Sequence, residues 1–422
     1  MRLRQIIRKP SYVSGTVELP ASKSISNRLL MLRALCGADG TPIENLSDAR
    51  DTRIMRDALH QDVSVHPQIN VADAGTAMRF LTAYFAMQPQ TVILSGAPRM
   101  HQRPIAPLVN ALNQLGADID YLERPGYPPL LIHQKMAEGG RSTISGQASS
   151  QFSSALMMIG PFMRQGLSLF ITPPRVSFPY IRMTQRLMHQ AGLQVDQDAQ
   201  GRYQIPPASF PHFAHTEVEA DWSAAAFMLA LLALSPDGGT IFLPHLRLES
   251  AQGDCSVLKR MASWGIRHRE ESGGLTVFRN AGASWPSGFE DDMLDAPDLI
   301  PPLAALCIAG RLPFRIRGIQ TLRDKECDRV AALQELAACH GMTLHAHYDT
   351  METYVPQSPP SFSPEPTVFR SRDDHRMVMS ALLLATQRPL AISEPDAVQK
   401  SYPGFWSVLE QLGFGFVDSV TS

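Results

Sequence analysis

Residues 108–121 read LVNALNQLGADIDY, and this stretch decides the fold because its pattern recurs along the chain. The apolar side chains fall at helical spacing as far as Gly116, and the residues after it alternate as those of a short strand do. Glycine suits the left-handed conformation that often ends a helix. The stretch therefore predicts a helix, a glycine turn and a strand.

The same pattern covers residues 184–197, 255–270, 329–347 and 405–419. The corresponding glycines are Gly192, Gly265, Gly341 and Gly413. They are separated by roughly 70 to 76 residues, which is the period of a repeated supersecondary unit. A sixth copy, 51–66, is shorter and has Asp62 in place of the glycine. One copy would be ordinary in any α/β protein, but five copies at near-constant spacing favour a repeat.

The chain of 422 residues is too long for one ordinary core and predicts two domains. Six units of about 70 residues account for its whole length. A change of composition at 217–221, just before the apolar run 224–234, marks the crossover. We expect one domain from 20–220 and another from 1–19 plus 221–422, each of three repeat units. Residues 355–366, VPQSPPSFSPEP, predict a proline-rich surface loop.

The composition excludes several classes of protein. With a formal net charge of −2, the protein lacks the overall positive charge that nucleic-acid-binding proteins carry. Any anionic ligand must therefore be bound by a few local cations. The longest apolar run is shorter than the roughly 20 residues that cross a bilayer, and no secretory signal follows the basic residues of 1–10. Five cysteines without a C-x-x-C pair argue against disulfides and zinc ribbons. We therefore expect a cytoplasmic protein without membrane, nucleic-acid or metal partners.

Several predicted helices begin with small residues and cations. In 20–28, PASKSISNR, a helix starts near Ser22 or Ser24, and its first turn offers backbone N–H groups, hydroxyls, Lys23 and Arg28. Such a helix start can hold a phosphate or carboxylate. The alternative is an ordinary serine cap with solvated cations.

Two further helix starts have the same character. In 73–79, DAGTAMR, Gly75 lets a ligand approach the backbone and Thr76 can cap the helix. Ser149, Ser150 and Gln151 precede an apolar helical stripe. Taken singly, each of these segments is more typical of helix capping than of binding.

Charged clusters follow in the second half of the chain. In 324–329, DKECDR, helical spacing would put Lys325 and Arg329 on one face, with Glu326 beside them. A carboxylate between cations can transfer protons if the site is partly desolvated. The alternative is a weak surface ion pair between Glu326 and Arg329. In 373–376, DDHR, His375 can titrate near neutrality. The alternative is that His375 and Arg376 simply lie on the solvated surface, as a lone His-Arg pair usually does.

These segments occur in one order: SKSxSNR, AGTAMR, PRMxxRPI, SSQF, PD, KExDR and DHRM. Together they resemble the 5-enolpyruvylshikimate-3-phosphate synthases, and the resemblance covers essentially the whole chain. It implies an α/β (α+β) fold of two similar domains, each of three βαβαββ units in an inside-out α/β barrel. It also implies an active site in the interdomain cleft, at the helix N-termini.

The resemblance implies a role for each matching residue. The shikimate 3-phosphate set is Lys23, Ser24, Arg28, Ser149, Ser150, Gln151, Ser177, Tyr180, Asp298, Thr321 and Lys325. The phosphoenolpyruvate set is Lys23, Gly75, Thr76, Arg103, Gln151, Arg329, Arg376 and Lys400. The catalytic set is Asp298 as base, Glu326 as acid and base at the methylene carbon, Lys23 and His375. Arg28 is expected to pair with the carboxylate of the shikimate moiety.

The implied reaction joins the shikimate 5-hydroxyl to C2 of phosphoenolpyruvate through a tetrahedral intermediate and releases phosphate. Both substrates carry a phosphate and a carboxylate, so several cations must offset their repulsion. Proton transfer on two sides of the reacting centre requires two carboxylates of different proton affinity. We expect a monomer that needs no metal or organic cofactor and whose partners are these two small molecules.

The sequence departs from the family pattern at several positions. Asp73 stands where Asn is usual, Phe80 where Pro is usual and Thr321 where Asn is expected. The segment between Arg53 and Asp73 is short, as if one hairpin were missing from the first unit. Because Gly75 retains room in the phosphoenolpyruvate pocket, we expect glyphosate, a ligand of that pocket in the family, still to bind.

Two other functions fit parts of the pattern. The sister enzyme that acts on UDP-N-acetylglucosamine uses a loop cysteine as acid, whereas residues 95–104 contain none. A non-catalytic anion-binding relative would account for Asp73 and the short first unit. Such a protein would not need both Asp298 and Glu326 beside anionic ligands.

Overall fold

The computed structural model describes residues 1–208, 213–354 and 365–420, so most of the predicted proline-rich loop lies outside the described residues. The chain forms two compact units. Unit 1 contains Met1–Pro20 and Glu219–Ser422, and unit 2 contains Ala21–Val218. The chain therefore passes between the units twice, after Pro20 and after Val218.

Within the described residues, unit 2 has two four-stranded sheets and one two-stranded sheet. The first, in spatial order, is β4 (Gln68–Asn70), β5 (Val92–Ser95), β7 (Leu130–Ile132) and β6 (Ile119–Tyr121). The second is β8 (Gly140–Ser145), β9 (Leu167–Thr172), β11 (Tyr203–Ile205) and β10 (Asp196–Gln197). The two-stranded sheet is β3 (Ile43–Glu44) and β12 (Thr216–Glu217).

Unit 1 has three four-stranded sheets among the residues that are described. The first is β2 (Val13–Thr16), β13 (Gly239–Pro244), β15 (Gly274–Arg279) and β14 (Arg267–Glu271). The second is β16 (Phe289–Asp292), β17 (Phe314–Arg317), β19 (Thr350–Tyr354) and β18 (Thr343–Ala346). The third is β20 (Thr367–Phe369), β21 (Leu390–Ser393), β1 (Arg2–Arg8) and β22 (Gly415–Val420).

All five four-stranded sheets have one topology. The first two strands run parallel, as β4 and β5 do, and the third and fourth strands follow antiparallel, as β7 and β6 do. The sheets β4–β7, β8–β11 and β16–β19 each come from one continuous βαβαββ segment, as predicted, whereas the other two sheets include β2 or β1 from the N-terminal segment. The two-stranded sheet keeps only the parallel pair, in which Ile43 lies opposite Thr216. The predicted loss of a hairpin from the first unit is therefore confirmed.

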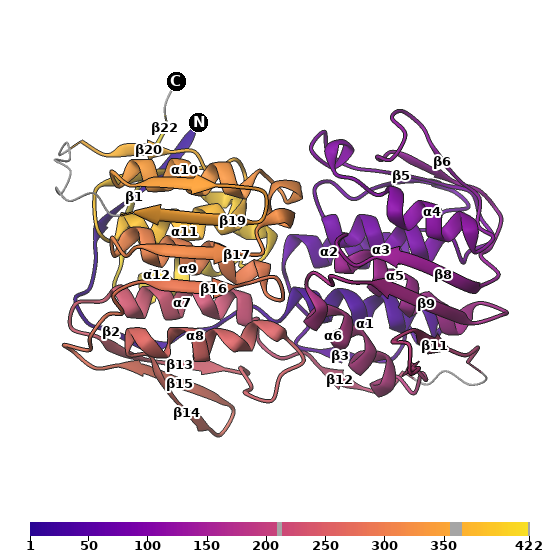
Figure 1. Cartoon of the computed structure of the whole chain (residues 1–422), viewed down its shortest axis with the longest axis horizontal. Helices are drawn as coiled ribbons and strands as arrows, with labels where there is room; N and C mark the ends of the chain where they lie inside the picture. Colours follow the sequence, from indigo (N-terminus) through magenta and orange to yellow (C-terminus); the bar gives the residue numbers. More distant parts are fainter. Residues whose placement is uncertain (209–212, 355–364, 421–422) are drawn as a thin grey trace. The chain divides into compact units, whose positions relative to one another are not determined.

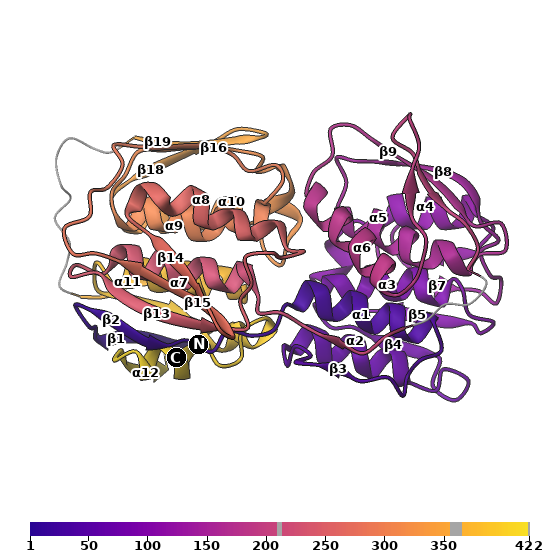
Figure 2. The same cartoon turned by 90° about the horizontal axis from the view of Figure 1, so that it is seen from below.

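The first helix of each unit lies inside. In unit 2 these helices are α1 (Lys23–Leu35), α3 (Gly75–Phe85) and α5 (Ser150–Ile159). In unit 1 they are α7 (Trp222–Leu234), α9 (Ile300–Ala309) and α11 (His375–Ala385), and every residue of these three is buried. A helix covered on all sides is apolar all round. Figures 1 and 2 show α7, α9 and α11 inside the strands of unit 1.

The second helix of each unit leads into the outer hairpin. These helices are α2 (Arg50–His60), α4 (Ala106–Gln114), α6 (Phe178–Gln190), α8 (Val257–Met261), α10 (Arg329–Cys339) and α12 (Phe405–Gln411). The five predicted glycines follow α4, α6, α8, α10 and α12, and all have positive φ, from 65° at Gly341 to 105° at Gly116. The predicted helix–glycine–strand pattern is therefore confirmed. After α2, Gln61 is extended instead, with φ −68°.

None of the helices in the described part of the chain combines the length and the apolar character needed to cross a membrane. Each of the five cysteines is free, as the sequence predicts.

The left-handed glycines can be tested by adding a methyl group. Gly413 has φ +94°, and a Cβ there would come no nearer than 3.7 Å to Pro10, so the cost of Gly413→Ala is conformational. We expect a loss of about 1–2 kcal/mol in the free energy of unfolding, read from the urea midpoint. Gly40→Ala is the matched control, since a Cβ at Gly40 meets nothing within 4 Å. An equal change in both variants would contradict this account.

Candidate active site

The start of α1 in unit 2 combines a helix cap with a buried ion pair. Ser22 is the N-cap residue, and its Oγ accepts a hydrogen bond from the Ile25 N–H at 3.5 Å. The Lys23 Nζ lies 2.9 Å from the Oδ2 of Asp51, a 4% exposed residue in the first turn of α2. Asp51 was not among the predicted site residues, although an acidic residue in the first turn of a helix is a recognisable signal.

Arg28, one turn further along α1, is only 2% exposed. The interpretation of this residue as a solvated cation is therefore wrong. Burial, the larger effect, lowers the pKa of its guanidinium to about 10. Its hydrogen bonds go to two hydroxyls and two backbone carbonyls. Within the described residues, Arg28 makes no ion pair with a carboxylate.

The start of α3 corrects one prediction. Thr76 does not cap this helix, because the N-cap residue is Ala74 and no side chain bonds there. Thr76 instead accepts a hydrogen bond from Gln151 Nε2 at 2.9 Å. Gly75 faces Arg103, since a Cβ on Gly75 would lie 2.5 Å from Arg103 Nη1. The absence of a side chain at Gly75 therefore makes room for that guanidinium.

Asp73, the departure from the usual Asn, lies between two arginines. Its Oδ1 is 3.9 Å from Arg50 Nη1, and its backbone oxygen accepts a long hydrogen bond of 3.5 Å from Arg103 Nη1. The negative charge at this position is thus partly offset by nearby cations.

The helix starts of α5 and α6 present serines. Ser149 is the N-cap residue of α5, and its hydroxyl accepts a hydrogen bond from the Gln151 N–H at 3.3 Å. Ser150 and Ser177 are each 8% exposed. Ser177 precedes α6 in a left-handed conformation with φ 55°. Tyr180 lies in the first turn of α6, with its ring centroid 6.0 Å from Arg28 Cζ.

In unit 1, Asp298 lies in a short 3-10 turn, η5 (Pro297–Leu299), before α9. Three cations surround its carboxylate: Lys325 at 3.5 Å, Arg329 at 3.4 Å and Arg376 at 3.1 Å. Burial by itself would raise the pKa of Asp298, but attraction to the three cations lowers it well below the usual value. Asp298 is therefore a carboxylate at neutral pH.

Arg329, 1% exposed, is the most enclosed of these cations. Its Nε and Nη2 bond to Asp374 at 2.9 and 3.3 Å, and Nη2 also bonds to Glu326 at 2.7 Å. Burial by itself would lower the pKa of Arg329, but these carboxylates raise it. One guanidinium thus joins Asp298 to Glu326. The predicted ion pair of Glu326 with Arg329 exists, but it is partly buried, since the Glu326 side chain is 14% exposed and that of Arg329 only 1%.

The predicted helical face shared by Lys325 and Arg329 is wrong. α10 begins at Arg329, and Lys325 lies before it in extended backbone after η6 (Gln320–Asp324). The two cations meet at Asp298 because the chain turns, not because they share a helix. Burial, the largest influence, lowers the pKa of Lys325 despite its attraction to Asp298.

The remaining predicted residues of unit 1 are also enclosed. His375 is 2% exposed, which excludes the solvated alternative. Lys400, 4% exposed, lies 2.9 Å from Asp373 Oδ2. Thr321 belongs to η6, and its hydroxyl is buried without a hydrogen-bond partner among the described residues.

Two buried carboxylates of unit 1 were missed. Asp374 caps α11 by accepting from the Arg376 N–H at 2.8 Å, and it also binds Arg329. An aspartate directly before a predicted helix is the signal that could have found it. Asp254, 2% exposed, bonds to the Ser223 hydroxyl. Burial, followed by the charge of Asp298, raises the pKa of Asp254 to about 6.

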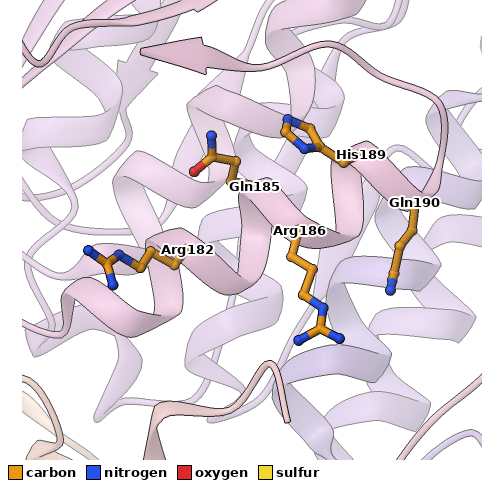
Figure 3. Close-up of a pocket in the computed structure, with 5 residues that line it drawn as sticks. All are labelled: Arg182, Gln185, Arg186, His189 and Gln190. Atoms are coloured by element: carbon orange, nitrogen blue, oxygen red, sulfur yellow. The ribbon is translucent and has the colours of Figure 1, made fainter. Parts of the chain in front are cut away.

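A surface hollow on α6 contains no predicted site residue. Arg182, Gln185, Arg186, His189 and Gln190 line it, and Figure 3 shows these side chains on successive turns of one helix. Gln185 and His189 both bond to the backbone oxygen of Val195 at 3.0 Å, so they tie α6 to the following segment. We assign this hollow no role in the reaction.

The predicted residues thus form two sets. In unit 2 they gather at the starts of α1, α3, α5 and α6, except Arg103, which follows the 3-10 turn η1 (Met100–Gln102) and lies against Gly75. In unit 1 they gather at the starts of α9, α10 and α11 and at η6 and η7 (Pro395–Lys400). The helix N-termini of each unit therefore carry cations, hydroxyls and carboxylates suited to anionic substrates.

The model of the family described as EPSP synthase (3-phosphoshikimate 1-carboxyvinyltransferase) matches residues 7–409. The chain belongs to the EPSP synthase family. It is accordingly a transferase of the shikimate pathway, which leads to aromatic amino acids, and its activity is 3-phosphoshikimate 1-carboxyvinyl transfer.

Curated members of the EPSP synthase family align with almost the whole chain. The 3-phosphoshikimate 1-carboxyvinyltransferase of Bacteroides fragilis is 39% identical over 419 residues, covering 98% of each chain. That of Nitrosomonas europaea is 33% identical and covers 93% of this chain and 94% of its own. The solved EPSP synthase of Acinetobacter baumannii superposes with a TM-score of 0.74 at 19% identity over both whole chains, which shows the shared fold.

The buried pair of Arg329 with Asp374 should make stability depend on acid pH. Burial by itself would raise the pKa of Asp374, but Arg329 lowers it, so the carboxylate stabilises the folded state above about pH 4. That contribution is lost as the pH falls through the lowered pKa. We expect Asp374→Asn to lower the free energy of unfolding by about 3–5 kcal/mol at pH 7.

The difference from the unmodified protein should shrink steadily between about pH 5 and pH 2, measured by urea unfolding. Asp396→Asn is the matched control, because Asp396 pairs with Arg2 at 2.6 Å on the surface and is 61% exposed. A difference for Asp374→Asn that stays constant over this pH range would contradict the account.

Proposed function

We propose that the two residue sets act on one pair of substrates, phosphoenolpyruvate and shikimate 3-phosphate. The set of unit 2 supplies Ser149, Ser150, Ser177 and Arg28 to shikimate 3-phosphate, together with Lys325 of unit 1. The phosphoenolpyruvate set is Lys23, Gly75, Thr76, Arg103, Gln151, Arg329, Arg376 and Lys400. The observation that supports this most strongly is the pair Asp298 and Glu326, both held by Arg329.

Asp298 is the proposed base for the shikimate 5-hydroxyl. Three cations hold it ionised, so it can accept a proton. When the phosphate and carboxylate of phosphoenolpyruvate bind to two of these cations, Arg329 and Arg376, part of that positive charge is neutralised. The proton affinity of Asp298 then rises at the moment when the base is needed.

Glu326 is the proposed acid and base at the methylene carbon. As the 5-hydroxyl oxygen bonds to C2 of phosphoenolpyruvate and loses its proton to Asp298, Glu326 in its protonated form gives a proton to C3. The resulting tetrahedral intermediate then loses phosphate from C2 as a proton of the C3 methyl group returns to Glu326. The proton that Asp298 accepted leaves with the phosphate. The 2.7 Å bond from Arg329 holds the Glu326 carboxylate in a fixed position for both steps.

Lys23 and His375 have supporting roles in this proposal. Asp51 holds the Lys23 ammonium in place at 2.9 Å. His375, buried at the start of α11, belongs to the proton network beside Asp374. The binding and proton-transfer steps use side chains throughout, so the mechanism calls on no metal or organic cofactor. The free cysteines support a reducing compartment, and we propose a cytoplasmic monomer.

The roles of the two carboxylates can be tested by phosphate release with both substrates present. Asp298→Asn and Glu326→Gln should each lower kcat by about 10²- to 10⁴-fold, because each removes a proton-transfer group. Asp295→Asn is the matched control, since Asp295 is exposed and lies three residues before Asp298. Release of phosphate from phosphoenolpyruvate alone, or full activity in both variants, would refute the assignment.

The position of Arg103 gives a second test. In Gly75→Ala the new methyl would lie within 3 Å of three guanidinium atoms of Arg103, so that side chain must move. We expect the KM for phosphoenolpyruvate to rise about tenfold or more, because a charge-assisted hydrogen bond is lost or weakened. Glyphosate, bound in the same pocket, should inhibit the variant less.

The KM for shikimate 3-phosphate in Gly75→Ala should stay within about twofold. Inhibition by glyphosate that does not depend on the phosphoenolpyruvate concentration would refute its placement in this pocket.

A further inference from the structure

We infer that Phe80 and Thr184 are positioning residues that orient the Arg28 guanidinium for the carboxylate of shikimate 3-phosphate. The inference rests on the role proposed for Arg28 and adds two residues to which the family resemblance assigned no role; at position 80 the family usually has proline. Neither side chain has to touch the substrate to act in this way.

Arg28 is a buried cation whose orientation depends on neutral groups. It is 2% exposed and, among the described residues, forms no ion pair with a carboxylate. Arg329 of unit 1 is buried to the same degree, but it has three carboxylates beside it. A cation removed from water without an anion needs other electron-rich partners.

Polar groups hold one edge of the Arg28 guanidinium. The Nε donates to Thr184 Oγ1 at 2.7 Å, and Nη2 donates to Ser154 Oγ at 3.1 Å. The two hydroxyls are also 2.8 Å apart, so they form one hydrogen-bonded cluster. The Nη1 donates to the backbone oxygen of Ser24 at 2.9 Å. These bonds fix the plane of the guanidinium.

An aromatic ring covers the face of that plane. The centroid of the Phe80 ring lies 5.3 Å from Arg28 Cζ, and Phe80 is fully buried. The negative face of an aromatic ring attracts a cation, and the attraction strengthens when water is excluded. Proline, which is usual here in the family, has no such face. The departure at Phe80 therefore supplies a contact that the common residue cannot.

The partners of Arg28 come from separate parts of unit 2. Phe80 lies on α3, Ser154 on α5 and Thr184 on α6, while Arg28 itself lies on α1. Four helices thus determine where this side chain points. A guanidinium has five N–H donors, and the four hydrogen bonds of Arg28 leave one donor on Nη1. That N–H is the one through which a carboxylate can bind.

Replacement of Phe80 by phenylalanines with one, two and three ring fluorines tests the aromatic contact. Fluorine withdraws electron density from the ring face but changes its shape little, so the fold should be retained. We expect the KM for shikimate 3-phosphate to rise stepwise with fluorine number, reaching about three- to twentyfold. The kcat and the KM for phosphoenolpyruvate should stay within about twofold.

Phe85 is the matched control, because it lies buried on the same helix and its ring packs against Tyr84 rather than an arginine. The same fluorinated residues at position 85 should leave both KM values unchanged. Thr184→Val, which keeps the side-chain shape but removes the acceptor of the Arg28 Nε, should raise the KM for shikimate 3-phosphate as well. Melting temperatures of all variants show whether a KM change follows merely from lost stability.

The variant Arg28→Lys distinguishes the binding role of Arg28 from the positioning role of Phe80 and Thr184. If it leaves the KM for shikimate 3-phosphate unchanged, the binding role of Arg28 is wrong and the inference falls with it. If Arg28→Lys raises that KM strongly but fluorination of Phe80 has no effect, the positioning role alone is overturned. A fluorine effect that disappears with a substrate analogue bearing a carboxamide in place of the carboxylate would support the inference directly.

Discussion

The placement of guanidinium groups away from water is the constraint on which the rest of this structure depends. A desolvated cation keeps a fixed position only if electron-rich groups surround it. Arg329 meets this requirement with three carboxylates, two of which are the proposed proton carriers. Arg28 meets it with hydroxyls, carbonyls and an aromatic face. The carboxylates beside Arg329 include the proposed proton-transfer groups, so this cation is part of the reaction centre. The neutral partners of Arg28 leave its positive charge to be balanced by a bound anion.

The repeated unit explains why such groups gather at helix starts. Each unit contributes one inner helix, and beyond the first turn the inner helices of unit 1 are almost entirely apolar. Functional side chains therefore have room only at the ends of these helices. At the N-terminal ends, unpaired backbone N–H groups favour anions. Within the described residues, the repeated unit, with five four-stranded sheets and one two-stranded sheet, thus provides several similar helix N-termini that can bind anions.

The sequence was sufficient for the architecture. The five glycines, at near-constant spacing, mark helix ends whose positive φ only glycine adopts freely, and this local requirement is visible without a structure. The short first unit was visible too, because a missing hairpin shortens the chain. The order of the motifs identified the family, which no single motif could do.

The partners of the site residues were not predictable in the same way. Asp51 and Lys23 are 28 residues apart, and Asp374 and Arg329 are 45 apart, so packing rather than local spacing joins them. Helical spacing also misled at Lys325, because the helix begins four residues later than that reasoning assumes. The sequence pattern around Arg28 and His375 is compatible with either an exposed or a buried side chain. Only the folded structure shows that both side chains are buried.

The strand order of unit 1 has a consequence for synthesis of the chain on the ribosome. β1, at the very beginning, pairs with β21 and with β22, at residues 415–420. At about 5–20 residues per second, this first strand waits on the order of half a minute before its partners emerge. Unit 2 is complete much earlier, by Val218. A nascent strand with unpaired edges can pair with other chains and aggregate. The positive charges of Arg2, Arg4 and Arg8 on β1 oppose such intermolecular pairing until translation is complete.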